Sequence, residues 1–559
     1  MDPETIRKKG SALLKDGVYL EAVANFTKSI ALATDESSKG LGYAARSAAL
    51  QATGHFIQAI EDARRALTHN YPEILRYQLH LRTAECWKAL GRVSESDESL
   101  CEAQRSIRDG PLSEKKKQEL LEAVREEKKD PRSAPGLSVR YLKAPPLSHG
   151  ARTDNERLSN AVEVKNDSKF GRHLIAARDI NTGDVLVVED PVISFLIETE
   201  NLEKGNKEAI WTHCSHCYKM CLTLEPCKSC KWALYCSTEC EESAWRGYHK
   251  DECRMRRKYD ALKAPSDPDS TSSWVRIMLK VLSTFPDPKI SEALSLLPDV
   301  FPDEKMERVG KLAQTLCRVC CEDCEEQQRL AGVCVRALLV FQRNSYTIDE
   351  SHVVPSADAF RLRQVIGRGL YPTVALINHS CDANVTRVFH LGTQVVKAIR
   401  PIKKGQQIFG SYGPDYGGMP RSRRQAILRE KFYFECDCDP CQSNWPLIAT
   451  TMGYVPEFLR KPSILPLLRE VVQKVIVGKT IQGRNYSAII NEEILNKCLA
   501  LQKLYFEAGE SRVDWIYFFT EKFIVSNFDL SAKIWVANKG EMGDSYLSAF
   551  NEETIFQAD

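Results

Sequence analysis

Eight residues that can bind a metal ion stand close together in the sequence. They form four pairs, and the members of each pair are separated by two or three residues: Cys214 and Cys217, Cys227 and Cys230, Cys236 and Cys240, and His249 and Cys253. Thiolate sulfur and imidazole nitrogen are ligands that zinc prefers, and a structural zinc ion takes four of them in a tetrahedron. The spacing therefore predicts two zinc ions bound within 214–253.

A second cysteine group has a different interpretation. Cys317, Cys320, Cys321 and Cys324 follow an i, i+3, i+4, i+7 pattern, which is typical of one face of a helix. Seven helical residues rise about 10 Å, whereas all ligands of one zinc ion lie about 2.3 Å from it. We therefore expect these thiols, and Cys221 near the first group, to pack in a core.

Further polar motifs are spread over the middle of the chain. They are a Gly-Arg step in 168–174 (SKFGRHL), the run 378–384 (NHSCDAN), a Ser-Tyr-Gly step at 411–413, and the segment 432–441 (FYFECDCDPC). Cys436, Cys438 and Cys441 in the last segment supply only three thiolates, one fewer than a closed structural zinc site requires.

The order of these motifs resembles that of the SET protein methyltransferases. The zinc-binding stretch between the two halves resembles a MYND finger, so the chain is similar to the SET and MYND domain (SMYD) family over about 161–445. The repeats described below place the resemblance in the member-four-like branch. The resemblance implies that the chain binds S-adenosyl-L-methionine and transfers its methyl group to a lysine of a protein substrate, histone or non-histone.

The resemblance also implies roles for individual residues. The implied cofactor contacts are Phe170, Gly171, Arg172, Asn344, Asn378, His379, Tyr412 and Phe434. Tyr412 is the implied catalytic residue, whose hydroxyl would orient the amine. Cys381 would join Cys436, Cys438 and Cys441 around a third zinc ion. The residue types agree with this assignment, because a flat, polar cofactor needs aromatic stacking, amide hydrogen bonds and a close approach to backbone.

Three positions depart from the family pattern. His173 replaces a glycine, Gln406 replaces an acidic residue, and Phe432 replaces a tyrosine that lines the lysine channel. None of them removes the implied catalytic group. We expect His173 to narrow the cofactor entrance and Phe432 to alter how many methyl groups are added.

The N-terminal part contains an internal repeat. Gly17, Gly54 and Gly91 recur at intervals of 37 residues, and small and aromatic residues recur with them. The pattern resembles the tetratricopeptide (TPR) repeat of about 34 residues and predicts three helix pairs over 3–108, with an irregular helical bundle as the alternative. A charged helix over 113–132 and a proline-containing linker are expected to follow.

The predicted fold is α+β and multidomain: an N-terminal helical TPR array, a mixed β SET domain split by a MYND zinc finger and a helical insert, and a C-terminal helical region. A hairpin is expected from strands 174–177 and 185–188, and helices are expected over 466–477, 488–506 and 513–525. The predicted boundaries are 3–110 for the repeats, 111–160 for the linker, 161–213 for the first SET part, 214–253 for the finger, 254–370 for the insert, 371–415 for the SET core, 430–445 for the post-SET zinc segment and 446–559 for the C-terminal region.

Composition narrows the possible partners. The chain has 559 residues, 43% of them hydrophobic and 27% charged, with a formal net charge of +2. A near-neutral chain has no broad basic field, so direct nucleic-acid binding is not expected. The sequence lacks a long apolar run, so no membrane association is expected. Twenty cysteines, clustered as metal ligands, are typical of a reducing compartment. We expect a monomer in cytoplasm and nucleus.

Two classes of function remain open. The first is the lysine methyltransferase, with protein partners docking on the TPR and MYND surfaces. The second is a catalytically weak or inactive scaffold that recruits protein partners, for example in transcriptional repression.

Overall fold

The structure is a computed structural model that describes residues 2–126, 137–140, 143–197, 209–261, 271–296, 299, 302–353, 361–477, 492–509, 512–530 and 534–538. Part of the predicted linker (127–136 and 141–142), including the end of the predicted charged helix, and the end of the predicted C-terminal region (539–559) lie outside these residues. Across the described residues, no helix is both long enough and apolar enough to span a bilayer.

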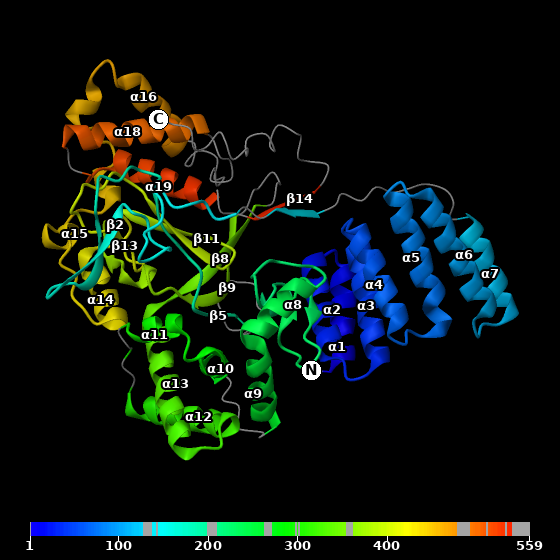
Figure 1. The fold of residues 1–559 in the computed structure, drawn as a ribbon. Coiled ribbons are helices and arrows are strands. Elements are labelled where there is room, and N and C mark those ends of the chain that lie inside the picture. The colour runs from blue at the N-terminus through cyan, green and yellow to red at the C-terminus, as the bar shows by residue number, and fades with distance from the viewer. Residues whose placement is uncertain are drawn as a thin grey trace. The chain divides into compact units, whose positions relative to one another are not determined.

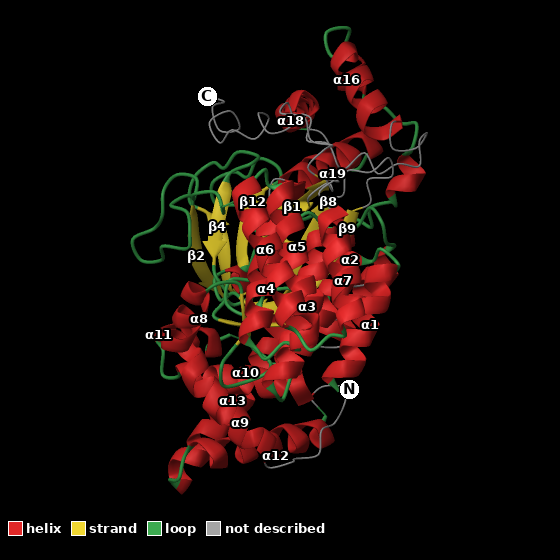
Figure 2. Ribbon diagram, turned by 90° about the vertical axis from the view of Figure 1, so that its right-hand side faces the viewer, coloured by secondary structure: helices red, strands yellow, loops and turns green. Residues whose placement is uncertain are grey.

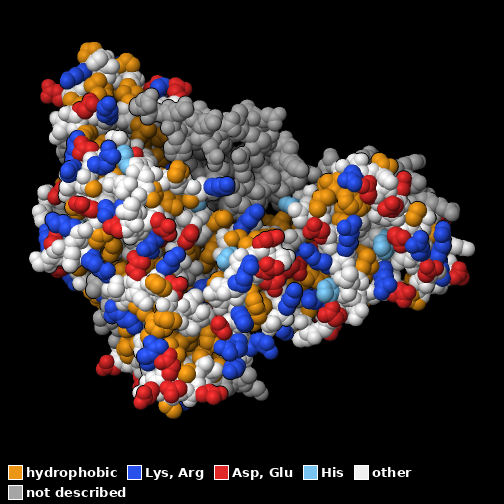
Figure 3. Space-filling view, in the orientation of Figure 1, with side chains coloured by type: hydrophobic (Ala, Val, Ile, Leu, Met, Phe, Trp, Pro, Cys, Tyr) orange, Lys and Arg blue, Asp and Glu red, His pale blue; other side chains and the backbone are white. Residues whose placement is uncertain are grey.

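The chain divides into two compact units that do not follow its linear order. The first contains 1–139, 196–253 and 536–559, and the second contains 140–195 and 254–535. The predicted zinc finger thus belongs to the same unit as the N-terminal helices (Figure 1). On the face drawn in Figure 3, acidic and basic side chains are intermingled, as the near-neutral net charge suggests.

The first unit begins with consecutive helices, as predicted. They are α1 (Pro3–Lys15), α2 (Tyr19–Leu32), α3 (Glu36–Ala52), α4 (Phe56–Thr68), the short η1 (Glu73–Leu75), α5 (Arg76–Ala89), α6 (Val93–Asp109) and α7 (Glu114–Glu126). Helices α1 to α6 contact one another as three sequential pairs. Aspartates cap the first and third helices: Asp2 and Asp35 accept hydrogen bonds from backbone amides of the first turn.

Two kinds of residue in the 37-residue repeat have a structural role: the glycine after the first helix of each pair, and the small residues between the paired helices. Gly17, Gly54 and Gly91 end the first helix of each pair with φ of 75°, 74° and 72°, a left-handed conformation that favours glycine. Small residues then let the paired helices approach, and the Ser47 hydroxyl donates to the Ala59 carbonyl at 2.7 Å.

The zinc-finger part consists of short elements. They are η2 (Ala209–Trp211), β6 (Glu225–Pro226), β7 (Leu234–Tyr235), α8 (Thr238–Ala244), the π-helical turn η3 (Trp245–His249) and α9 (Lys250–Ala261). A buried arginine joins this part to the helical array. Arg46 of α3 forms an ion pair with Asp62 at 2.7 Å and donates to the Leu224 carbonyl at 2.8 Å and to Glu225 at 3.1 Å.

The second unit contains most of the strands. They are β2 (Val162–Asp167), β3 (Gly171–Ala176), β4 (Val185–Glu189), β5 (Ile193–Leu196), β8 (Ser345–Val353), β9 (Arg361–Leu370), β10 (Asn378–His379), β11 (Val385–His390), β12 (Thr393–Ala398), β13 (Phe409–Gly410) and β14 (Ile534–Asn538). The division of the chain into two units falls within β5, β14 and the additional strand β1 (Leu137–Arg140). Strand β12 lies between β11 and β4, and β8 pairs with β9. Figure 2 shows β12 beside β4.

The predicted hairpin of 174–177 with 185–188 is wrong. Strand β3 pairs with β2, and β4 pairs with β12, although the predicted turn exists, with Gly183 at φ 95°. Strand β2 was missed because four of its six residues are polar and only Val162 is buried, so it lacks the apolar pattern of a strand. Its turn to β3 is closed locally, because the Asp167 carboxylate accepts the backbone N–H groups of Lys169 and Phe170 at 3.0 and 2.8 Å.

The predicted insert contains helices α10 (Thr271–Thr284), α11 (Pro288–Leu294), α12 (Asp303–Cys320) and α13 (Cys324–Asn344), which share one apolar core, and it ends in strands β8 and β9. The four-cysteine run does not form one helical face, since α12 ends at Cys320 and α13 begins at Cys324. Cys317 is nevertheless in the core, and the four thiols form no metal-binding group among the described residues.

The C-terminal region is helical, as predicted. It contains η5 (Ile448–Thr451), η6 (Glu457–Arg460), α16 (Leu465–Val471), η7 (Val472–Val477), α18 (Glu492–Ala508) and α19 (Trp515–Leu530). Helices α14 (Arg421–Phe432) and α15 (Asp439–Gln442) come before this region and pack with it, and a 3-10 turn η4 (Val374–Leu376) precedes β10. One core joins these helices to Cys381, Cys436 and Cys441, so the third cysteine group is built into the packing of this region.

Candidate functional site

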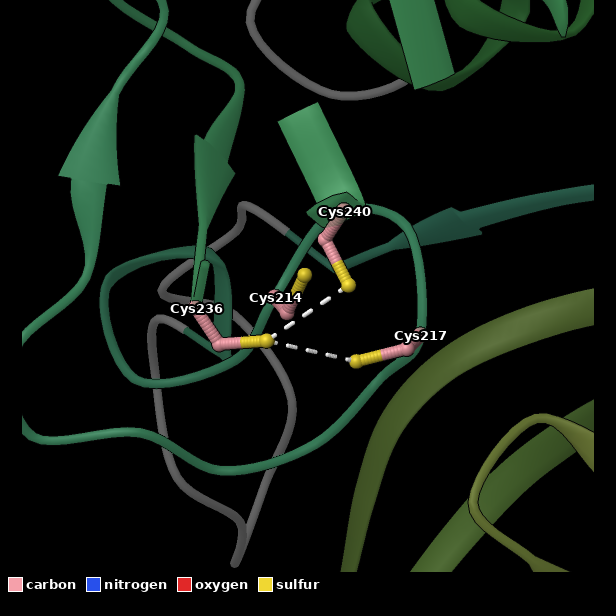
Figure 4. A group of neighbouring side chains, drawn as sticks. All are labelled: Cys214, Cys217, Cys236 and Cys240. Atoms are coloured by element: carbon pink, nitrogen blue, oxygen red, sulfur yellow. Dashed lines mark hydrogen bonds between the residues drawn. The ribbon is translucent and has the colours of Figure 1, made fainter. Parts of the chain in front are cut away.

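The predicted zinc-finger ligands form two interleaved groups of four. Cys214, Cys217, Cys236 and Cys240 point toward one another (Figure 4), and the second group consists of Cys227, Cys230, His249 and Cys253. Successive pairs of the sequence pattern therefore belong to alternate groups: the first and third pairs form one group, and the second and fourth pairs form the other. In each group, the ligand atoms lie within 4.8 Å of one another.

The spacing of the sulfur atoms fits a tetrahedral ion. With zinc–sulfur bonds of about 2.3 Å, the edges of the tetrahedron are about 3.8 Å. The Cys236 sulfur lies 3.6 Å from that of Cys217 and 3.6 Å from that of Cys240, and the Cys230 sulfur lies 3.5 Å from His249 Nε2. Both groups can hold a zinc ion.

A carboxylate orients the histidine ligand. Glu252 Oε2 lies 3.0 Å from His249 Nδ1, on the ring nitrogen opposite the one that faces Cys230. Such a partner fixes the tautomer and the ring orientation of a metal-binding histidine. Sequence reasoning missed Glu252, although its place three residues after His249 on a helix could have indicated it.

The third group joins residues that are distant in sequence. Cys381 meets Cys436, Cys438 and Cys441, with its sulfur 3.6 Å from that of Cys441. Helix α14 holds the segment in place: the Gln425 side-chain amide exchanges hydrogen bonds of 2.6 and 3.0 Å with the Cys436 backbone. Fully buried Arg424 contacts the Cys441 sulfur at 3.7 Å, and its positive charge stabilises thiolates there.

One large cavity collects the scattered polar motifs of the second unit. Its volume is about 1540 Å³. Its walls include all the residues that the sequence predicted as cofactor contacts: Phe170, Gly171, Arg172, Asn344, Asn378, His379, Tyr412 and Phe434. A cavity of this size, lined by aromatic rings, amides and backbone, suits a nucleoside cofactor together with a second substrate.

The β2–β3 turn forms one wall of the cavity. Gly171 has a φ of 60° and leaves open space where a Cβ would stand. Asn378 connects this turn to the other motif, because its side-chain amide donates to the Phe170 carbonyl at 3.4 Å. Arg172 is held at the rim by hydrogen bonds of 3.1 Å to the backbone carbonyl and hydroxyl of Ser295.

Two short parallel strands place the central residues side by side. In the β10–β13 pair, Asn378 stands opposite Phe409 and His379 opposite Gly410. Asn384 fixes β13 through two hydrogen bonds: its amide donates to the Gln407 carbonyl at 2.9 Å, and its oxygen accepts from the Phe409 amide at 2.8 Å. The second asparagine of the NHSCDAN motif therefore has a positioning role.

Tyr412 lies in an aromatic pocket of this cavity. Its ring centroid is 4.8 Å from that of Phe432, 5.3 Å from that of His379 and 6.4 Å from that of Phe434. Its hydroxyl donates to the Ile377 carbonyl at 3.1 Å. Burial raises the pKa of Tyr412, so its hydroxyl keeps its proton at neutral pH.

His379 connects this pocket to the third cysteine group. Its Nδ1 accepts from the Tyr412 backbone amide at 3.1 Å, and its Nε2 lies 3.3 Å from the Cys381 sulfur. Burial is the main cause that lowers the pKa of His379 to about 4. A neutral ring suits the accepting role of Nδ1.

The departures from the family pattern have distinct places. Phe432 and Gln406 line the cavity. His173 is not among its lining residues; its ring is buried, 5.5 Å from that of Phe170, and its Nδ1 lies 2.9 Å from the Gly171 carbonyl oxygen. It therefore supports the turn.

Sequence reasoning missed several cavity residues. Arg343, Tyr346 and Arg387 line the walls near Tyr412, and Lys169 and Asp437 form an ion pair of 2.7 Å at the rim. Lys169 and Asp437 lie inside the quoted segments 168–174 and 432–441, but no role was predicted for them, and the other three residues lie outside those segments. These residues are recognised as part of the cavity wall only because the fold brings them together.

Comparisons with known proteins agree with this geometry. A model of the SET domain matches residues 171–413. The protein-lysine N-methyltransferase SMYD4 of Homo sapiens is 26% identical over 545 residues, covering 79% of this chain and 67% of that protein. The histone-lysine N-methyltransferase SMYD3 of Homo sapiens is 28% identical over 289 residues, covering 51% and 62%. The solved SET domain of LSMT, bound to lysine and AdoHcy, is 12% identical, with 66% of this chain and 85% of that one covered and a TM-score of 0.23.

Proposed function

We propose that this chain, a member of the SET and MYND domain (SMYD) family, is a protein-lysine methyltransferase that uses S-adenosyl-L-methionine. The observation that carries the proposal is the convergence of the predicted cofactor contacts and Tyr412 on one cavity. When bound, the cofactor supplies a methyl group on a sulfonium, which is an excellent leaving group. The protein therefore has to bind the cofactor and the lysine, orient them toward each other and exclude water.

The cavity residues divide this work between them. The backbone at Gly171 allows close approach of a ligand, Asn378 and His379 offer polar groups, and Phe434 offers an aromatic surface. A lysine entering beside Tyr412 and Phe432 leaves water and loses part of the solvation of its charge, which favours the neutral amine. Tyr412, which keeps its proton, orients that amine through its hydroxyl oxygen.

Zinc has a structural role in this proposal. Each of the three groups supplies four thiolate or imidazole ligands. None therefore has the open coordination position that a catalytic zinc ion needs. The third ion would hold the segment that carries Phe434 against the loop that carries His379. Protein partners are proposed to dock on the TPR-like array and on the finger, in cytoplasm or nucleus.

Methyl transfer into cell proteins tests the proposal. Tritiated S-adenosylmethionine and heat-treated lysate proteins are incubated with the wild-type chain or with Tyr412→Phe, and labelled residues are identified by mass spectrometry. We expect labelled methyl-lysine with the wild type and a loss of about 100-fold or more in the variant. No labelling by the wild type, with zinc present, would favour the scaffold alternative.

A further inference from the structure

An arginine on β11 reaches into the pocket of Tyr412. The Arg387 guanidinium donates to the carbonyl of Ser411, the residue before Tyr412, at 2.6 Å, and it lies over the Tyr346 ring at 4.6 Å from the centroid. The side chain is thus fixed at the cavity wall by one hydrogen bond and one aromatic face.

A second cation faces the same pocket. Arg343 on α13 donates to the carbonyl of Phe432 at 3.2 Å and lies over the Tyr433 ring, with 5.4 Å to its centroid. The nearby phenols of Tyr346 and Tyr412 have pKa values raised by burial, and both stay neutral at physiological pH. The lysine pocket is therefore flanked by guanidinium groups and uncharged phenols.

Four acidic groups on or near the cavity wall form ion pairs with other cations. Asp382 pairs with Arg400 at 2.8 Å and with Arg512 at 2.9 Å. Asp437 pairs with Lys169, Glu435 with Arg429, and buried Glu189 with Arg157. Asp439 lies next to Cys438 in the third cysteine group. These pairs leave the guanidinium of Arg387 as a strong source of positive potential at Tyr412.

We propose that Arg387 is a positioning residue of the methyl-transfer pocket, whose fixed positive charge disfavours the ammonium form of an entering lysine and so favours the nucleophilic amine. The inference rests on the function proposed above. A like charge within a few ångströms of a titrating group, shielded from water, opposes its protonation. The ammonium proton is released to solvent before the methyl group is transferred, and the arginine takes no part in a covalent step.

The pH dependence of methyl transfer tests this role. The rate at saturating cofactor and saturating acceptor is measured between pH 6 and about 10, with one purified acceptor chosen from the labelled lysate proteins. Under these conditions the rising limb reports the ionisation of the bound complex. Arg387→Gln should move the midpoint of this limb upward by about one pH unit, whereas Arg387→Lys should keep it. A merely structural arginine would change the rate without moving the midpoint.

A matched variant controls for lost packing. Arg368 on β9 also lies over an aromatic ring, 5.4 Å from the centroid of Phe341, and donates to the Ser345 hydroxyl at 2.6 Å, but it is not among the residues lining the cavity. Arg368→Gln should leave the midpoint unchanged. An equal shift in Arg368→Gln and Arg387→Gln would overturn the proposal.

Cofactor binding gives a readout that is independent of turnover. The sulfonium of S-adenosylmethionine is cationic and the thioether of S-adenosylhomocysteine is neutral, so a fixed positive charge in the shared cavity weakens the first relative to the second. By calorimetry, Arg387→Gln should improve the affinity ratio in favour of S-adenosylmethionine by about threefold or more, and Arg387→Lys and Arg368→Gln should not. Unchanged midpoint and ratio in an active protein would refute the inference alone, whereas a wild type that neither binds cofactor nor transfers methyl would refute the proposed function.

Discussion

Some residues of the second unit have buried ionisable side chains, and the free-energy cost of burying their charged form can be measured. Lys397 of β12 is buried, with its ammonium over the ring of Phe528 at 5.2 Å. Burial lowers its pKa to about 8 from the ordinary value of 10.5. Between these two pH values, the unfolded chain binds a proton that the folded chain does not, so stability rises with pH in that window.

We therefore predict that Lys397→Met increases the free energy of unfolding at pH 7 by about 1–3 kcal/mol. The gain should be complete below pH 8 and should shrink as the pH rises toward 10.5, because the wild type then loses the charge that burial penalises. Urea unfolding at several pH values measures it, with the exposed Lys404→Met as the control. A gain that does not depend on pH would contradict this account.

The individual site residues were accessible to sequence reasoning to different degrees. The two four-residue groups within 214–253 could be predicted from the chain alone, because paired cysteines at short spacing have few other uses. The proposed cofactor contacts, and the place of Cys381 in the third group, came from the resemblance of the motif order to a known family. Arg387 could not be predicted in this way, because an arginine on a strand is ordinary in sequence and acquires a role only from its neighbours in space.

Elements of the fold show where local pattern is insufficient. The repeated helices and the C-terminal helices were predicted because their apolar periodicity is local. The pairing of β3 with β2 was not predicted, because strand pairing depends on long-range packing. For the same reason β4 pairs with β12, which is distant in the sequence. The run containing Cys317 and Cys324 fits a helical period, yet the backbone breaks between α12 and α13.

At the same scale, Arg46 joins the helical array to the finger. It is fully buried and paired with Asp62 and Glu225. We predict that Arg46→Ala lowers the free energy of unfolding by about 3–5 kcal/mol, since it leaves the Asp62 carboxylate buried without this partner. Arg65 pairs with the same two carboxylates from a partly exposed position, so Arg65→Ala should cost less than about 1 kcal/mol. Chemical denaturation with zinc present compares them, and equal costs would argue against the buried pair.

The third cysteine group makes a prediction about metal content. Purified wild type should contain three zinc ions per chain, matching the three groups, and Cys381→Ser should contain two. Cys221, which lies near the finger but outside the groups, supplies the control: Cys221→Ser should keep three. Mass spectrometry of the metal content decides, and a Cys381→Ser protein that retains three ions would show that this thiol is not a ligand.

The whole molecule combines segments that the linear order separates. The zinc finger interrupts the SET part in sequence but packs in one compact unit with the N-terminal helices. Composition and motifs predicted the modules, and they could not predict this grouping, because it depends on contacts such as that of Arg46 with Glu225. Zinc ions held by the two finger groups would therefore stabilise the helical array, on which protein partners are proposed to dock.

The central claim is that the cavity shared by Phe170, Asn378 and Phe434 binds S-adenosylmethionine. Calorimetric titration of the zinc-loaded full chain tests it most directly. The account predicts one molecule bound per chain, an affinity at least about tenfold weaker in Asn378→Ala, and wild-type affinity in Asn160→Ala, whose asparagine is exposed and not among the residues lining the cavity. Absence of binding at millimolar cofactor, or equal affinity in wild type and Asn378→Ala, would contradict it.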